Sequence, residues 1–150
     1  MPSQFDGFGI RFLYPENWEV VQRDEDEGDQ GVTLDFPGAG FLSIERTQAD
    51  RSDHLIEGII DAIEAEYEQV ERDETSMEIL PTNTPVTDLR FYYLDLMIVS
   101  RLLVLDHLFD SQGDDVLVVQ LQAESRDFDK NEPILSAILK QILDSAIETS

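Results

Sequence analysis

The stretch Phe12-Leu13-Tyr14-Pro15-Glu16-Asn17-Trp18 decides how the N-terminal part of this chain folds. The run from Ile10 to Tyr14 is rich in residues that favour β-strands, and Pro15 and Asn17 favour a turn. A second apolar run, residues 18–21, begins immediately after that turn. The stretch therefore predicts two short strands joined by a Pro-x-Asn turn.

The strand pattern continues beyond this turn. Val32, Leu34 and Phe36 alternate with other residues, so they share one face of a strand. Pro37-Gly38-Ala39-Gly40 marks a turn, and residues 41–46 return as another strand. A polar hairpin loop, residues 24–31, separates this pair from the first two strands. The N-terminal part thus predicts a meander of about four strands.

Two amphipathic helices are predicted downstream. In the first, Asp50 and Ser52 are candidate N-caps, and apolar residues recur every three or four positions. Its apolar stripe consists of Leu55, Ile56, Ile59, Ile60, Ile63, Tyr67 and Val70. The second helix is predicted to begin at Asn131 or Glu132, with Pro133 in its first turn. Its stripe consists of Ile134, Leu135, Ile138, Ile142 and Leu143.

The segment between the helices predicts further strands. Residues 76–80 form a candidate strand that ends at the proline-bounded segment 81–85. Residues 86–109 are too long for one ordinary strand, so we expect a turn near residues 98–101. A turn at 112–115 leads into a strand at 116–123, whose two faces are both largely apolar and need cover on both sides. This order of elements predicts an α+β fold.

The ordered set of motifs resembles the PsbP/Mog-one superfamily. The resemblance rests on Tyr14-Pro15-Glu16-Asn17-Trp18, the acidic hairpin, the Leu42-Ser43-Ile44 strand, the helix 53–70, the strand 116–123, Phe128 and the closing Ile142-Leu143-Asp144-Ser145. It implies a single domain, residues 1–150, folded as an α/β/α sandwich with a central antiparallel sheet flanked by two main helices. Members of that superfamily are mostly not enzymes. One branch consists of acidic cytosolic chaperones for secretion effectors that are often dimeric, which implies a homodimer as one option.

The net charge of −23 and the sequence pI of about 4.1 limit the classes of partner. Such a surface repels nucleic acid and anionic membranes, and it attracts basic proteins. Acidity with so few lysines is equally typical of adaptation to a salty cytosol. The absence of cysteine excludes disulfides and thiolate sites. Residues 1–7 do not resemble a signal peptide, and the apolar run 96–105 is too short to span a bilayer, so we expect a cytoplasmic protein.

The sequence contains no recognisable catalytic, metal-binding or cofactor-binding motif. His54 lies in a predicted helix, and His107 is next to Asp106, but neighbouring strand residues point to opposite faces. No Gly-x-Ser-x-Gly motif occurs, and the glycines of residues 37–40 fit a hairpin turn better than a phosphate loop. The acidic run 24–29 departs from the EF-hand spacing, so a solvated loop is the better interpretation. We therefore predict no enzyme activity and no cofactor.

The candidate partner-binding residues lie in the apolar segment 86–109. Consecutive aromatic residues in a strand place one ring on each face, and tyrosine and arginine are favoured at interfaces. We select Arg90, Tyr92, Tyr93, Arg101, Leu103, Leu105 and His107. The sequence thus predicts a non-enzymatic protein-binding or adaptor protein, chaperone-like, whose partner offers a basic or apolar segment. Two alternatives stay open: a small-ligand-binding or hydrolytic domain that uses surface carboxylates, and an acidic structural subunit of a larger complex.

Overall fold

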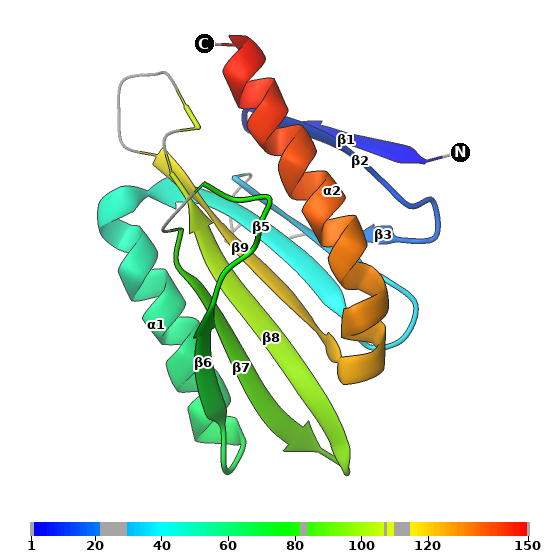
Figure 1. Cartoon of the computed structure of the whole chain (residues 1–150), viewed down its shortest axis with the longest axis vertical. Coiled ribbons are helices and arrows are strands. Elements are labelled where there is room, and N and C mark those ends of the chain that lie inside the picture. Colours follow the sequence, from blue (N-terminus) through cyan, green and yellow to red (C-terminus); the bar gives the residue numbers. More distant parts are fainter. Residues whose placement is uncertain (1, 22–29, 82–83, 107, 110–114, 150) are drawn as a thin grey trace.

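The computed structural model describes residues 2–21, 30–81, 84–106, 108–109 and 115–149. Two helices and nine strands follow one another along this part of the chain (Figure 1). Their bounds are β1 (Ser3–Gly7), β2 (Ile10–Tyr14), β3 (Glu19–Val21), β4 (Gly31–Asp35), β5 (Phe41–Gln48), α1 (Ala49–Glu66), β6 (Glu71–Thr75), β7 (Val86–Tyr93), β8 (Leu96–Leu105), β9 (Asp115–Glu124) and α2 (Ser125–Thr149). The fold is therefore α+β, as the sequence predicts.

Seven strands form one antiparallel sheet in the order β3-β4-β5-β9-β8-β7-β6. Strand β9 lies in the middle, where Val119 pairs with Ile44 on one side and with Leu103 on the other. The separate two-stranded sheet is the hairpin of β1 and β2. The strand predicted at 116–123 is thus confirmed, and its two apolar faces are explained by its central position.

The two helices cover opposite faces of the large sheet. Leu135, Ile138 and Ile142 of α2 belong to a core that includes Val119 and Leu103. Ile60 and Ile63 of α1 instead pack with Leu89, Phe91 and Leu102, from the other face. Each such side chain contributes roughly 1.5–3 kcal/mol when it leaves water completely. Figure 1 shows α2 in front of the sheet, and the predicted α/β/α sandwich is confirmed.

The turn after β2 is fixed by a buried tryptophan. The amide of Trp18 donates a hydrogen bond to the carbonyl of Pro15 at 3.0 Å. The Trp18 ring is buried and lies against Phe36, with 4.9 Å between ring centroids. The Pro-x-Asn turn is therefore confirmed. The predicted four-strand meander is wrong in its first step, because β2 pairs with β1 outside the large sheet and only β3, β4 and β5 of that meander pair in succession.

Both helices begin earlier than the sequence predicts. The residue that precedes α1 is Gln48, whose side chain makes no cap hydrogen bond, whereas Asp50 and Ser52 lie inside the first turns. Helix α2 begins at Ser125, six positions before Asn131, and it contains Pro133 in its interior. Pro133 lacks an amide proton, but it lies on an exposed position where the freed carbonyl can be solvated. Phe128 lies in the additional helical residues 125–130 and is buried in the core, so its burial favours the helical conformation of this segment.

Two predictions in the segment between the helices are wrong. The sixth strand is Glu71–Thr75, not residues 76–80, and the latter form a turn in which the amide of Leu80 donates to the carbonyl of Met77 at 3.1 Å. The turn inside residues 86–109 lies at Leu94 and Asp95 instead of 98–101. Strand β1 was not expected from the sequence, and the turn at 112–115 and the loop 24–31 fall mainly outside the described residues.

Candidate protein-binding site

The tip of the β7–β8 hairpin is the most exposed apolar feature of the described chain. The exposed fractions are 63% for Tyr92, 54% for Tyr93, 78% for Leu94 and 45% for Leu96. A single exposed apolar side chain is common on protein surfaces, but four within five consecutive residues concentrate apolar surface at one turn. We call these four residues the hairpin tip.

The backbone of the hairpin tip is in a conformation that its sequence does not favour. Tyr93 pairs with Leu96, so the loop between them has only two residues, Leu94 and Asp95. Their φ values are +49° and +67°. Two positive φ values are typical of a type I′ turn, for which Asn-Gly is preferred, and a leucine with positive φ costs about 1–2 kcal/mol. Strain of this kind accumulates at functional sites.

The two strands divide the hairpin tip into two sides. Tyr93 and Leu96 are partners in the register and point to the side covered by α1, together with the buried ring of Phe91. Tyr92 and its partner Met97 point to the other side, as do Arg90 and Val99. The tip therefore offers two separate apolar surfaces, with Leu94 at their common end.

A second tyrosine positions Tyr93 on the α1 side. The ring of Tyr67, just after α1, stacks on Phe91 with 4.4 Å between centroids, and it meets Tyr93 edge-on at 6.2 Å. Burial of the Tyr67 phenol raises its pKa, and the negative charge of Glu66 and the neighbouring Tyr93 raise it further. Tyr67 is thus a neutral hydrogen-bonding group beside the exposed ring of Tyr93. We call Tyr67, Tyr93 and Leu96 the tyrosine patch.

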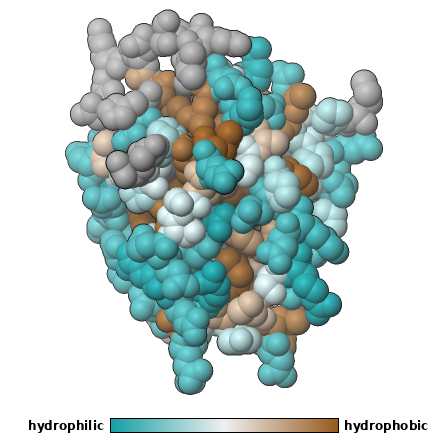
Figure 2. All heavy atoms as spheres, viewed as in Figure 1, coloured by the Kyte–Doolittle hydropathy of each residue, from teal (hydrophilic) through white to brown (hydrophobic). Residues whose placement is uncertain are grey.

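The charges near the tip differ between its two sides. On the α1 side, Glu66 and Glu68 flank Tyr67, and Asp95 lies in the turn. On the other side, Arg90 forms an ion pair with Asp73 and lies 3.9 Å from Asp88. The tyrosine patch therefore has exposed glutamates next to Tyr67 in the chain, whereas Arg90 lies on the Tyr92 side. The α1 side also carries a cation, Arg72, but its register partner is Leu89, farther from the turn. In Figure 1 the end of α1 and the hairpin tip lie at the same, lower end of the molecule, where Figure 2 shows apolar surface next to hydrophilic surface.

The structure separates the partner-binding residues selected from the sequence into three groups. Tyr92 and Tyr93 are exposed at the tip, and Arg90 is half-buried beside them. Arg101, Leu103 and Leu105 are buried beneath α2, so their side chains do not form part of an exposed surface. His107 lies outside the described residues. Sequence reasoning missed Leu94 and Leu96, and a correct placement of the turn would have revealed them.

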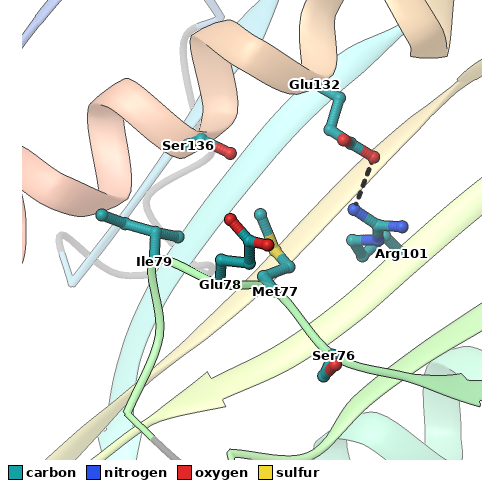
Figure 3. A pocket seen from close by; sticks show the side chains of 7 residues that line it. All are labelled: Ser76, Met77, Glu78, Ile79, Arg101, Glu132 and Ser136. Carbon is teal, nitrogen blue, oxygen red and sulfur yellow. Dashed lines mark hydrogen bonds and ion pairs between the residues drawn. The ribbon is translucent and has the colours of Figure 1, made fainter.

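A second feature is a cleft between α2 and the segment 76–79. Its volume is about 600 Å³, and its lining includes Glu78, Arg101, Glu132 and Ser136. Figure 3 shows Glu78 and Met77 projecting from the segment toward α2, with Arg101 and Glu132 joined at one end of the cleft. Exposed carboxylates at the mouth of this cleft make it the place where the small-ligand alternative can be tested.

Arg101 in this cleft is the centre of a buried ion-pair network. Its Nε and Nη2 atoms donate to the two carboxylate oxygens of Asp88 at 2.8 and 3.0 Å, and Nη1 donates to Glu132 at 2.8 Å. Burial by itself lowers the pKa of Arg101, but hydrogen bonds and charges from Asp88 and Glu132 outweigh burial and raise it. The guanidinium also lies 5.1 Å from the centroid of the Phe128 ring. This network connects β7, β8 and the first turns of α2.

Two other kinds of site were sought among the described residues. No group of three or more His, Asp or Glu side chains within the described ranges is placed to hold a metal ion. Neither of the helices in the described part of the chain has the length and apolarity to cross a membrane.

Comparison with solved structures identifies the type of fold. The chain is similar to the solution structure of cyanobacterial PsbP (CyanoP) from Synechocystis sp. PCC 6803, with a TM-score of 0.52 and 11% sequence identity over 93% of this chain and 90% of that one. The chain has a PsbP-like fold. The fold implied by the sequence resemblance is therefore confirmed, whereas an identity this low carries no information about activity.

Other comparisons add little to the PsbP-like fold. A crystal structure of PA94 from Pseudomonas aeruginosa, a protein of unknown function described as a putative regulator, is similar with a TM-score of 0.40 and 12% identity. That match covers 93% of this chain and 94% of the other. No protein-family model and no curated protein sequence matches the chain.

Proposed function

We propose that this protein is a non-enzymatic protein-binding module that contacts its partner through the hairpin tip. The observation that carries the proposal is the exposure of Tyr92, Tyr93, Leu94 and Leu96 at one projecting turn. Burial of apolar area contributes about 25 cal/mol for each Å² that leaves water, and tyrosines are frequent hot spots in interfaces. We therefore propose that a protein partner covers the hairpin tip.

The geometry of the tip supports the same proposal in a second way. The register of β7 and β8 and the contact between Tyr67 and Tyr93 hold the aromatic rings in place before a partner arrives. A preorganised surface loses less conformational entropy on binding than a flexible loop does. The unfavourable turn at Leu94 and Asp95 is then the cost of displaying an apolar side chain at the apex.

The proposal can be tested by site-specific photocrosslinking in cells of the native host. A benzoylphenylalanine residue replaces Leu94 in one variant and the exposed Leu13, on the separate β1–β2 hairpin, in the control. We expect one dominant protein adduct from position 94 and none of that mass from position 13. Equal adduct patterns from both positions, or no adduct from position 94, would contradict binding at the tip.

The same experiment addresses the context of the binding. A cytoplasmic location is part of the proposal, and fractionation of the cells before crosslinking shows the compartment in which the adduct forms. An adduct found only in one large, stoichiometric complex would instead favour the acidic structural subunit. Light scattering on the purified protein then distinguishes a monomer from a homodimer.

The cleft beside Arg101 favours a second candidate function, the binding of a small cation. The exposed carboxylate of Glu78 lines the cleft together with the hydroxyls of Ser76 and Ser136, so an aliphatic amine is a suitable occupant. Thermal unfolding with 1,4-diaminobutane tests this candidate, and Glu78→Gln is the matched variant. A rise in the unfolding temperature that occurs in the original protein and is absent in Glu78→Gln would support a binding site in the cleft. Identical shifts in both would show nonspecific screening of the acidic surface.

A further inference from the structure

We propose that the partner docks on the tyrosine patch with a short segment in which an apolar side chain is flanked by lysine or arginine. This inference rests on the proposed function and specifies both the side of the hairpin tip that is used and the chemistry of the partner. The apolar side chain packs on Tyr93 and Leu96, and the cation lies near Glu66 and Glu68. The Tyr92 side of the same hairpin is left free.

The apolar half of the docking site is defined by side chains on the α1 side. Tyr93 and Leu96 are cross-strand partners, so they lie next to each other on one face. Tyr67 closes the surface toward α1 through its edge-on contact with Tyr93. Phe91 is buried beneath these side chains and stacks on Tyr67, so the tyrosine patch rests on a packed aromatic ring. One leucine, phenylalanine or tyrosine side chain of a partner fits across this patch.

The charged half follows from the carboxylates that border the patch. Glu66 is the last residue of α1, immediately before Tyr67, and Glu68 follows Tyr67 directly; both glutamates are exposed. Asp95 adds a third carboxylate at the turn. The tyrosine rings can also attract a cation through their faces. On the Tyr92 side Arg90 already pairs with Asp73, so we place the basic residues of the partner on the α1 side, beside Glu66 and Glu68.

Charge also argues against other occupants of the tyrosine patch. A second copy of this chain would bring another net charge of −23, with the same glutamates around the same patch. An anionic membrane would be repelled for the same reason. A basic segment of another protein is attracted by the charge of the whole molecule before it reaches the patch, which raises the association rate.

The test uses a random twelve-residue peptide library displayed on phage and selected against the full-length chain at low salt. Enriched peptides are synthesised, and their dissociation constants are measured for the original protein and for three variants. We expect enriched sequences to combine an aromatic or aliphatic residue with neighbouring lysine or arginine. The amide resonances of Tyr93 and Leu96 should shift in ¹H–¹⁵N spectra on titration with the peptide.

Matched variants separate this inference from the proposed function. Tyr93→Ser with Leu96→Ser should weaken binding about tenfold or more, since about 1.4 kcal/mol corresponds to a factor of ten. Glu66→Gln with Glu68→Gln should weaken it about 1.4- to fivefold for each carboxylate, because exposed ion pairs contribute about 0.2–1 kcal/mol. Tyr92→Ser, on the opposite side of the hairpin tip, tests the choice of side and should weaken binding clearly less than the Tyr93 and Leu96 variant does. Far-UV circular dichroism and urea midpoints confirm that each variant is folded.

Each contrary result has a definite meaning. Loss of binding in Tyr92→Ser but not in the Tyr93 and Leu96 variant would overturn the inference and leave a protein-binding tip intact. Enrichment of acidic or uncharged peptides would overturn the proposed charge of the partner. No enrichment above background, together with binding to neutral phosphatidylcholine vesicles, would overturn both the inference and the proposed function.

Discussion

At the scale of single residues, Arg101 illustrates how burial determines the role of a charged side chain. Arginine is frequent at interfaces, but this guanidinium is buried and all three of its nitrogens donate to carboxylates. The Asp88 side chain is 4% exposed and the Glu132 side chain is 44% exposed. Asp88 therefore depends on Arg101 for its charge compensation, whereas Glu132 is stabilised by water as well.

Replacing Arg101 should therefore strongly destabilise the fold. Arg101→Met removes both hydrogen bonds to the buried carboxylate of Asp88 and leaves only Arg90, 3.9 Å away, as a cation near it. The expected loss is roughly 3–5 kcal/mol in the free energy of unfolding. Glu132→Gln should cost at most about 1 kcal/mol, because that partner is partly exposed. Urea denaturation measures both values. Adding Asp88→Leu to Arg101→Met should restore part of the loss, and a cost below about 1 kcal/mol for Arg101→Met alone would contradict this account.

Tyr67 makes stability depend on pH in the alkaline range. Its folded-state pKa is raised above the ordinary 10.0, chiefly by burial of the phenol, so the folded protein retains a proton that the unfolded chain loses first. The stabilisation is fully present below pH 10.0 and is lost as the pH rises through the folded-state pKa. Absorbance at 295 nm, compared between the original protein and Tyr67→Phe, isolates this phenol. A difference titration centred below 10.0 would contradict the prediction.

At the scale of elements, the β7–β8 turn combines an unfavourable backbone with an exposed apolar side chain. Replacing Leu94-Asp95 by Asn-Gly supplies the residues that two positive φ values favour, and it removes no buried surface. We expect the free energy of unfolding to rise by about 1 kcal/mol and partner binding at the tip to weaken. Gln69→Gly is the control, because Gln69 also has a positive φ, of +57°, but lies outside the hairpin tip. If the Asn-Gly variant instead loses stability, Leu94 makes stabilising contacts that the turn geometry does not explain.

The elements that sequence patterns predict well are those whose apolar periodicity is unambiguous. The stripe of α1 as far as Ile63 and the doubly apolar strand β9 were placed correctly, because burial on one face or on two leaves a clear pattern. The helix was predicted to continue to residue 70, but it ends at Glu66, and Tyr67 and Val70 lie beyond it. The hairpin turn was misplaced because Leu94 and Asp95 carry no glycine, asparagine or proline signal. Residues 71–75 are all exposed and charged or polar, so nothing in their pattern indicates the edge strand β6.

The sequence pattern also predicts part of the candidate site. Consecutive tyrosines indicate that at least one ring lies on each face of β7, and both prove to be exposed because the strand extends to the turn. Strand β8 is apolar on both faces, so the sequence does not distinguish an exposed leucine from Leu103 or Leu105 beneath α2. Only the position of the turn determines that Leu96 is exposed and Leu105 is not.

At the scale of the whole molecule, the charge of −23 acts on folding and on binding in opposite directions. Mutual repulsion of carboxylates destabilises the compact state, whereas the same field attracts a basic partner. Raising NaCl from about 10 mM to about 1 M shortens the Debye length from about 30 Å to about 3 Å, which screens both effects.

We therefore expect salt to raise the free energy of unfolding and to weaken binding of the basic peptides. Urea midpoints and dissociation constants measured over the same NaCl series test the two responses together. Asp53→Asn with Asp61→Asn, at exposed positions of α1 six or more residues before Tyr67, should reduce the response of the free energy of unfolding to salt. The response of peptide affinity to salt should stay nearly unchanged. If stability rises with salt while affinity stays constant, the acidity maintains solubility in a salty cytosol and does not select the partner. If affinity falls while the enriched peptides are basic, the same carboxylates also guide the partner to the tip.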